Sequence, residues 1–274
     1  MPGRLPIDLK TMRRLAREMR DVETTERPLV VAGARELATV LARELSKDAV
    51  PGAVREGGAI DRPAALLYLL AGEPNEDDTR ELRAAGRAKV PVVCLQLGAA
   101  AVQIPQVPAT DVVVVPRGQG FPLEEIGRAL ARRLDGDAAP LAARVPALRG
   151  AICEELIRKS SRRGGAVGVA TFIRGSDLPV LFLEQTRLVL LLAIAHGRKL
   201  KPARAAELVA VLVAGLGLRK LARRSSLARA LPGWLLKGSI AYAGTHAVGS
   251  GALRYFSSSV GAEGRSERPT TLSE

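Results

Sequence analysis

The fold is decided by residues 28–46, which read PLVVAGARELATVLARELS. The apolar run 29–32 lies between Pro28 and Gly33, and this pattern predicts a short strand that is buried on both faces. Residues 34–46 then repeat Leu at helical spacing, which predicts an amphipathic helix directly after the strand. A strand that leads straight into a helix is the beginning of an α/β fold.

The same alternation of apolar runs and amphipathic segments continues to residue 134. Further strands are predicted at 64–70, 90–95 and 112–115, with a weak extra strand in 48–60, and helices are predicted at 76–88 and 122–134. Alternating strands and helices predict a mainly parallel sheet that is covered on both faces. The order of these elements resembles a small, Rossmann-like GTPase domain.

The second half of the chain predicts helices without strands. They are expected at 151–162, 178–196, 203–224 and 234–256, and a separate amphipathic helix is expected at 8–20. We therefore predict a lead-in helix at 1–27, an α/β domain at 28–137, a Gly-, Pro- and Ala-rich linker at 138–150, a basic helical domain of about four to five helices at 151–256 and a disordered tail at 257–274.

The first strand-to-helix junction tests the sequence for nucleotide chemistry. A P-loop has the pattern G-x-x-x-x-G-K-[ST], whose Lys neutralises phosphate charge and whose hydroxyl ligates Mg²⁺. With Gly33 in the first position, the last three positions hold Ala38, Thr39 and Val40. Because the cation and the metal ligand are both missing, we predict little or no phosphoryl transfer.

The guanine-binding motif N-K-x-D is also missing from its expected place. After the strand at 90–95 the chain reads QLGA at 96–99, which contains no carboxylate. Residues 115–120, VPRGQG, resemble the last loop of a GTPase. Gly33 keeps two interpretations, as a glycine needed only for a tight turn or as the start of an anion-binding helix.

Other catalytic chemistry finds no support in the sequence. Cys94 and Cys153 are isolated thiols, and His196 and His246 have no neighbours at metal-ligand spacing. We predict no catalytic, cofactor-binding or metal-ligating residues. The N-terminus shows no apolar signal region, so we expect a cytoplasmic protein.

The net charge of +13 is concentrated in one block. Residues 1–143 contain 20 basic and 20 acidic residues, whereas residues 144–237 contain 18 basic and 5 acidic ones. The candidates for contact with an anionic membrane surface or an acidic partner are Arg162, Arg163, Arg198, Lys199, Lys201, Arg204, Arg219, Lys220, Arg223 and Arg224. If these cations share one side they would hold an anionic leaflet. A merely solvated basic face is the alternative.

Small residues recur every four positions in the last predicted helix. They are Ser239, Ala243, Ala247 and Gly251, and a second stripe is Ala206, Ala210 and Ala214. Such stripes let helix backbones approach closely. We therefore predict helix packing along them.

Two parts of the helical domain carry a family resemblance. Residues 177–187 (DLPVLFLEQTR), continuing to 194–197 (IAHG), and residues 241–249 (AYAGTHAVG), ending at 254–256 (RYF), resemble the opening and closing helices of the domain of unknown function numbered 697. Members of this family often follow GTPase domains in bacteria. The resemblance spans roughly 150–256. It implies a fold and a neighbouring domain, and no activity.

The sequence thus favours a non-catalytic binding or regulatory protein, a pseudo-GTPase with no cofactor, peripheral on the inner face of the membrane. Membrane insertion is the alternative for the helical domain, although Glu184 and Arg187 interrupt the apolar segment 178–196. An atypical GTPase is the enzymatic alternative. Nucleic-acid binding is disfavoured because few aromatics are available for stacking, and homo-oligomerisation stays open.

Overall fold

The computed structural model describes residues 9–57, 62–98, 104, 107–170, 177–199 and 233–266. The chain divides into two compact units. The α/β unit comprises residues 21–156, and the helical unit comprises residues 1–20 together with 157–274. The predicted order, an α/β part followed by a helical part, is confirmed.

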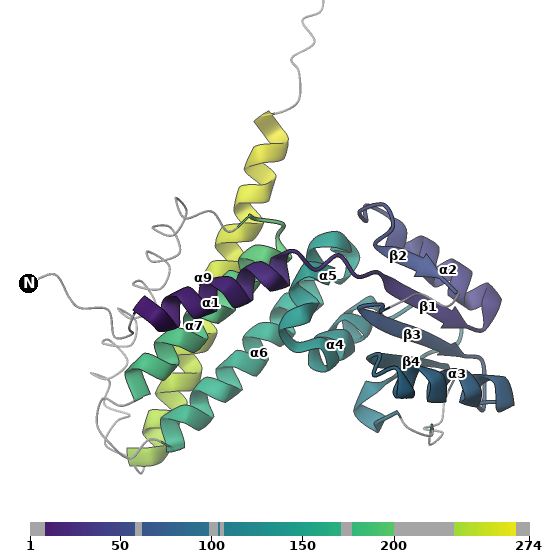
Figure 1. The fold of residues 1–274 in the computed structure, drawn as a ribbon, viewed down its shortest axis with the longest axis horizontal. Helices are drawn as coiled ribbons and strands as arrows, with labels where there is room; N and C mark the ends of the chain where they lie inside the picture. Colours follow the sequence, from purple (N-terminus) through teal and green to yellow (C-terminus); the bar gives the residue numbers. More distant parts are fainter. Residues whose placement is uncertain are drawn as a thin grey trace, which may run out of the picture. The chain divides into compact units, whose positions relative to one another are not determined.

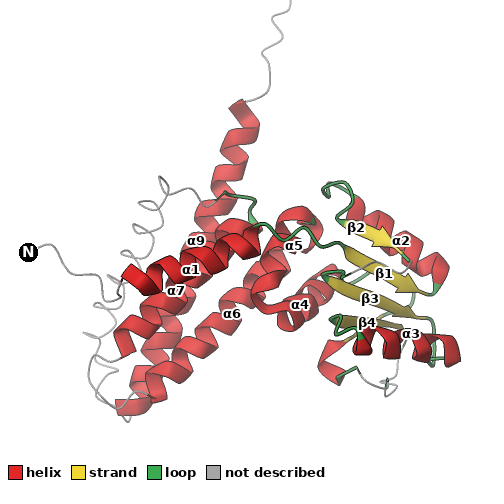
Figure 2. Ribbon diagram, in the orientation of Figure 1, coloured by secondary structure: helices red, strands yellow, loops and turns green. Residues whose placement is uncertain are grey.

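A five-stranded, fully parallel sheet forms the centre of the α/β unit (Figure 2). The strands are β1 (Leu29–Gly33), β2 (Val54–Glu56), β3 (Ala65–Leu70), β4 (Val92–Leu97) and β5 (Val112–Val115). Their order in the sheet is β2-β1-β3-β4-β5. The helices are α2 (Arg35–Ser46), α3 (Glu76–Arg87), α4 (Leu123–Leu134) and α5 (Ala138–Arg144), with 3-10 turns at Ala109–Asp111 and Asp135–Asp137. The weakly predicted strand within 48–60 is therefore present as β2.

Helices cover the two faces of this sheet because the chain winds from β1 in both directions. On one face Leu82 of α3 belongs to a buried cluster with Tyr68 and Cys94. The alternating residues, such as Leu67 and Val93, are 0% exposed on the other face. There α2 contacts β1, β2 and β3. The crossovers β1-α2-β2 and β3-α3-β4 run in opposite directions along the sheet, and right-handed crossovers therefore place α2 and α3 on opposite faces. Helix α4, which follows the last strand, contacts β4 and β5.

Residues 138–150, for which the composition predicted a linker, are helical instead. They form α5 and the first turn of α6 (Pro146–Ala170). Leu141, Val145 and Leu148 are at most 2% exposed. Ala is the strongest helix former, and Pro is tolerated in the first turn of a helix, so this Ala- and Pro-rich segment packs as part of the α/β core.

The helical unit is built from α7 (Asp177–Ala195), α9 (Gly233–Ser266), the later part of α6 and most of α1 (Leu9–Glu23). The last helix is longer than predicted, since the segment 257–266, expected to be disordered, continues α9. That segment contains no proline, and its Ala, Ser and Glu residues permit a helix. The predicted helix at 203–224 and the residues after 266 lie outside the described residues.

Glycines let α6 and α9 approach closely within the helical unit. A Cβ added to Gly164 of α6 would lie 2.8 Å from the Thr245 hydroxyl oxygen of α9. A Cβ added to Gly238 of α9 would lie 2.6 Å from a methyl group of Val169. Both contacts are too short for a larger side chain, so close backbone approach is built into this helix pair.

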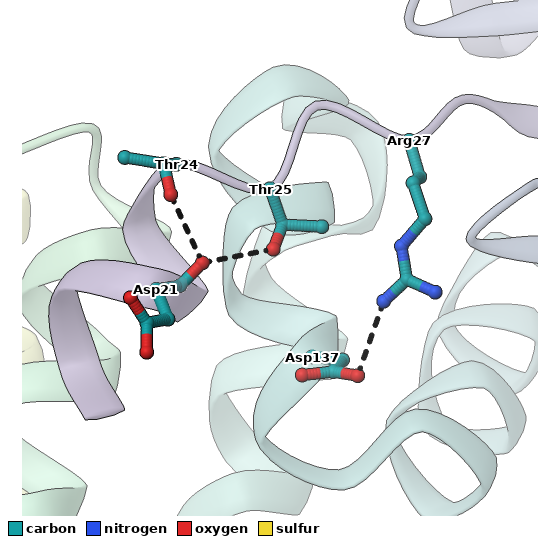
Figure 3. Close-up of polar contacts among 5 residues, drawn as sticks. All are labelled: Asp21, Thr24, Thr25, Arg27 and Asp137. Atoms are coloured by element: carbon teal, nitrogen blue, oxygen red, sulfur yellow. Dashed lines mark hydrogen bonds and ion pairs between the residues drawn. The ribbon is translucent and has the colours of Figure 1, made fainter. Parts of the chain in front are cut away.

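Polar contacts within the α/β unit involve the residues between the end of α1 and β1 (Figure 3). The Thr24 and Thr25 hydroxyls both donate to the Asp21 carbonyl oxygen at 3.1 Å. Arg27 then forms a 3.3 Å ion pair with Asp137. The threonine hydroxyls cap a carbonyl group in the last turn of α1, and the Arg27 ion pair holds the segment before β1 within the α/β unit.

Candidate functional site

The junction between β1 and α2 occupies the place of a P-loop. Only Ala34 lies between Gly33, the last residue of β1, and Arg35, the first residue of α2. In a P-loop the residues between strand and helix form the loop that surrounds the phosphates. A junction of one residue leaves no such loop.

The three diagnostic P-loop positions are the fourth, fifth and sixth residues of α2. Ala38 is buried, and Val40 is 53% exposed. The Thr39 hydroxyl, which has one proton to donate, lies 3.0 Å from the Arg35 carbonyl oxygen and within hydrogen-bonding distance of the Glu56 carboxylate. Thr39 is therefore engaged within the protein, next to a carboxylate that would repel a phosphate.

Gly33 is required by its approach to β3. Its φ is +100°, and a Cβ there would lie 2.1 Å from the Leu69 carbonyl oxygen. The next residue, Ala34, donates its N–H to the same oxygen at 2.9 Å. The geometry favours the tight-turn interpretation of this glycine.

The strand order reverses between β1 and β3, where open α/β sheets usually bind ligands. On the α3 side, a hollow of about 780 Å³ lies beside this point. Its apolar lining includes Val30, Ala32, Leu66 and Tyr68, and its charged lining comprises Arg35, Glu56, Asp77, Asp78 and Glu81. Four carboxylates against one guanidinium make this acidic hollow a poor site for a polyphosphate.

Asp78 has a structural role in the acidic hollow. The Asn75 side chain accepts from the Asp78 N–H at 2.8 Å, and the Asn75 N–H donates to the Asp78 carboxylate at 2.9 Å, which together cap α3. The Tyr68 hydroxyl donates to the same carboxylate at 2.8 Å. Burial, reinforced by this hydrogen bond, raises the pKa of Tyr68 far above its ordinary value. The phenol therefore remains a proton donor to Asp78.

The loops after β4 and β5 contact each other, but they place a hydrogen-bond donor where guanine would need an acceptor. A Cβ added to Gly98 would lie 3.2 Å from Nε of Arg117. Guanine presents an amino donor to its partner, and a guanidinium can only donate. Gln96 is 4% exposed, and its Oε1 accepts no hydrogen bond from the described residues. Ala99 lies outside the described residues.

The two thiols are buried, and both remain protonated at neutral pH. Burial raises the pKa of Cys94 and of Cys153 from 9.0 to about 12, and the carboxylate of Asp111 adds to this effect at Cys94. The thiolate is the reactive form.

We therefore expect Ellman's reagent at pH 8 to modify neither cysteine in the native chain and both after unfolding in urea. Rapid modification of the native chain would contradict the buried placement.

The same pKa shifts predict a loss of stability in alkali. Above pH 9 the unfolded chain loses its thiol protons, whereas the folded chain keeps them up to about pH 12. The cysteines therefore lower the free energy of unfolding between these two pH values. Replacing Cys153 with Ser should flatten part of this decline in urea titrations across that range.

The two histidines pack within their helices. His196 is half-buried, and its Nδ1 lies 2.8 Å from the Leu192 carbonyl oxygen. His246 is exposed, with its Nδ1 3.3 Å from the Ser250 hydroxyl. Within the described part of the chain, no group of three or more His, Cys, Asp or Glu residues is arranged to hold a metal ion.

Four of the ten predicted surface cations lie in described segments. Arg162 and Lys199 are exposed, and Arg163 and Arg198 are partly buried. The Arg198 guanidinium lies 5.6 Å from the centre of the Phe256 ring. The other six, Lys201, Arg204, Arg219, Lys220, Arg223 and Arg224, lie outside the described residues. A shared face for all ten stays a prediction.

The predicted small-residue stripe on α9 is not the packing face of the described helices. Ser239, Ala243 and Gly251 are exposed, Ala247 is only half-buried, and a Cβ at Gly251 would meet open space. The residues that pack lie on the adjacent face and are Gly238, Ala241, Thr245, Val248, Gly249 and Ala252. Because residues 200–232, which contain the other predicted stripe, lie outside the described residues, helix packing along Ser239, Ala243, Ala247 and Gly251 stays a prediction. The second stripe, Ala206, Ala210 and Ala214, lies outside the described residues.

Sequence reasoning missed the acidic hollow. The signal was present, because Asp77, Asp78 and Glu81 follow a spacing that brings residues together on one helix. The strand order, which places α3 beside the end of β1, could not be predicted from the sequence.

The fold and this site define a class: a doubly wound parallel α/β unit, without a phosphate loop at its first junction, joined to a helical unit. No family model matches the chain, and no curated protein is detectably similar to it. The resemblance to the domain 697 family stays a prediction. Among the described helices, none combines the length and the apolar character needed to cross a bilayer.

Proposed function

We propose that this chain is a non-catalytic binding protein, in which a GTPase-like α/β unit serves as a scaffold and the helical unit contacts an anionic surface. The observation that carries the proposal is the single-residue junction between β1 and α2. It holds positions 38–40 within a helix, where they cannot surround a phosphate. Binding without catalysis is the function that this geometry supports best.

The electrostatics of the α/β unit support the same conclusion. Phosphoryl transfer depends on cations and Mg²⁺ that neutralise the phosphate oxygens. At the equivalent edge of this sheet the acidic hollow supplies carboxylates, and Thr39 is hydrogen-bonded to Glu56. A triphosphate placed there would meet repulsion.

The excess positive charge supports the anionic partner. The net charge is +13, and the basic excess lies between residues 144 and 237. Of the cations expected to make contact, Arg162 and Lys199 are exposed. The resemblance to the domain 697 family is compatible with this arrangement and adds no activity.

Titration of the full chain with fluorescent GTP and Mg²⁺ tests the proposal. We expect no saturable binding below about 1 mM, which corresponds to a binding free energy weaker than about −4 kcal/mol, and no release of phosphate. Saturable micromolar binding that the substitution Thr39→Ala abolishes would overturn the proposal. Val40→Ala, which alters an exposed neighbour on α2, is the matched control.

A further inference from the structure

One side of α1 is basic along two turns. Lys10, Arg13, Arg14 and Arg17 are all exposed, and they follow the spacing that places residues on one side of a helix. At 3.6 residues per turn they span roughly 100° of the circumference and about 10 Å along the axis. We call these four residues the basic face of α1.

The opposite side of α1 anchors the helix within its unit. Leu15 and Met19 are 5% and 0% exposed. On the flank between the two sides, Glu18 forms a 3.0 Å ion pair with Arg187 of α7, beside which α1 lies in Figure 1. Because this docking already holds the helix, the basic face is presented to a partner with little further ordering cost.

The four cations of the basic face outnumber the two acidic residues that follow them at i+4 on α1, Glu18 and Asp21. None of its four cations forms an ion pair with a described residue. Helix α1 has no acidic residue in its first turn, so Lys10 lies at the positive end of the helix dipole. Both features are unfavourable for an isolated helix, and an external anion would relieve them.

We infer that the basic face of α1 lies on the anionic headgroups of a phospholipid bilayer, an inference that rests on the proposed function and names its contact surface. Four cations on one convex side can all meet a flat anionic surface at once. The face has no aromatic or large apolar side chain to anchor a protein interface, and no amide or aromatic group to contact bases. Its exposed uncharged neighbour is Ala16. The contact is therefore electrostatic and weakens with salt.

Vesicle sedimentation with the full chain tests the inference. The probes are vesicles of phosphatidylcholine alone, and of phosphatidylcholine and phosphatidylserine mixed two to one. We expect binding only to the second kind. The triple substitution Arg13→Ala, Arg14→Ala and Arg17→Ala should lower the partition coefficient roughly a hundredfold, about fivefold for each cation. Ala is a strong helix former, so α1 should remain folded and the melting temperature should not fall.

A second triple variant controls for net charge. It removes three exposed cations from the α/β unit by Arg43→Ala, Arg83→Ala and Arg87→Ala. If binding depends on where the cations lie and not only on the net charge, this variant should change the partition coefficient by less than about threefold. Equal losses in the two triple variants would overturn the inference, as would binding that ignores phosphatidylserine.

The outcomes also separate this inference from the proposed function. If the parent chain binds anionic vesicles and the α1 variant binds equally well, the basic face is excluded while the proposed function stands. If the parent chain binds no anionic vesicle, the anionic surface itself is excluded. If polyglutamate or duplex DNA binds the parent more tightly than vesicles, and the α1 variant loses that binding, lipid is the wrong partner.

Discussion

The substitution Gly33→Ala is expected to lower the free energy of unfolding of the α/β unit by about 3 kcal/mol or more. The added Cβ would lie 2.1 Å from the Leu69 carbonyl oxygen, and the φ of +100° is one that L-residues rarely adopt. The three atoms nearest to the added Cβ all belong to the Leu69 backbone, so the clash is relieved only if β1 separates from β3. Hydrogen exchange measured on peptides from β1 and β3 within the full chain reports this loss locally.

Gly118→Ala is the matched control for this substitution. Gly118 also has a positive φ, +76°, but no atom lies within 4 Å of its added Cβ. We expect only the conformational cost, about 1 kcal/mol. Equal losses in the two variants, or unchanged exchange in β1 and β3 of Gly33→Ala, would show that the close approach to Leu69 is not what requires glycine.

The strands and helices of the α/β unit were predictable because their signals are local. The uninterrupted apolar runs identified β1, β3, β4 and β5, and Asn75 with Asp78 marks the start of α3 by a capping box. The strand order was not predictable, since it depends on contacts between distant segments. Without that order, the sequence could not place the carboxylates of α3 beside the junction between β1 and α2.

The absence of P-loop residues could be identified from sequence, whereas its structural consequence could not. Ala38, Thr39 and Val40 fail the motif by residue type alone. The structure adds that they belong to a helix that begins only one residue after the strand. A sequence motif specifies which side chains are present, but it does not determine at which residue the strand ends and the helix begins.

The basic face of α1 shows a further limit of composition. Summed charge assigned the cationic character to residues 144–237, because residues 1–143 are balanced. A net charge of zero over a long segment does not exclude a cluster of cations on one side of a helix within it. Burial of Leu15 and Met19 fixes which side of α1 faces outward, and that orientation is set by tertiary packing.

Gly249→Leu is expected to destabilise the helical unit by about 3 kcal/mol, whereas Gly251→Leu should leave it unchanged or stabilise it by up to about 1 kcal/mol. A Cβ at Gly249 would lie 2.8 Å from Ile157 of α6 and 3.0 Å from Leu188 of α7, while at Gly251 it would meet nothing within 4 Å. Larger side chains at Gly249 must therefore push apart two neighbouring helices.

These two variants carry the same substitution on the same helix, two positions apart, so helix propensity cancels between them. Urea titration measures the difference in the free energy of unfolding between the two variants. Hydrogen exchange on peptides from α7 and α9 then shows whether the loss lies in these helices. The stripe chosen from the sequence includes Gly251 and omits Gly249, so it predicts the reverse ranking. If Gly251→Leu proved the more damaging, the packing face of α9 would be the exposed one, and the described arrangement of α6, α7 and α9 would be wrong.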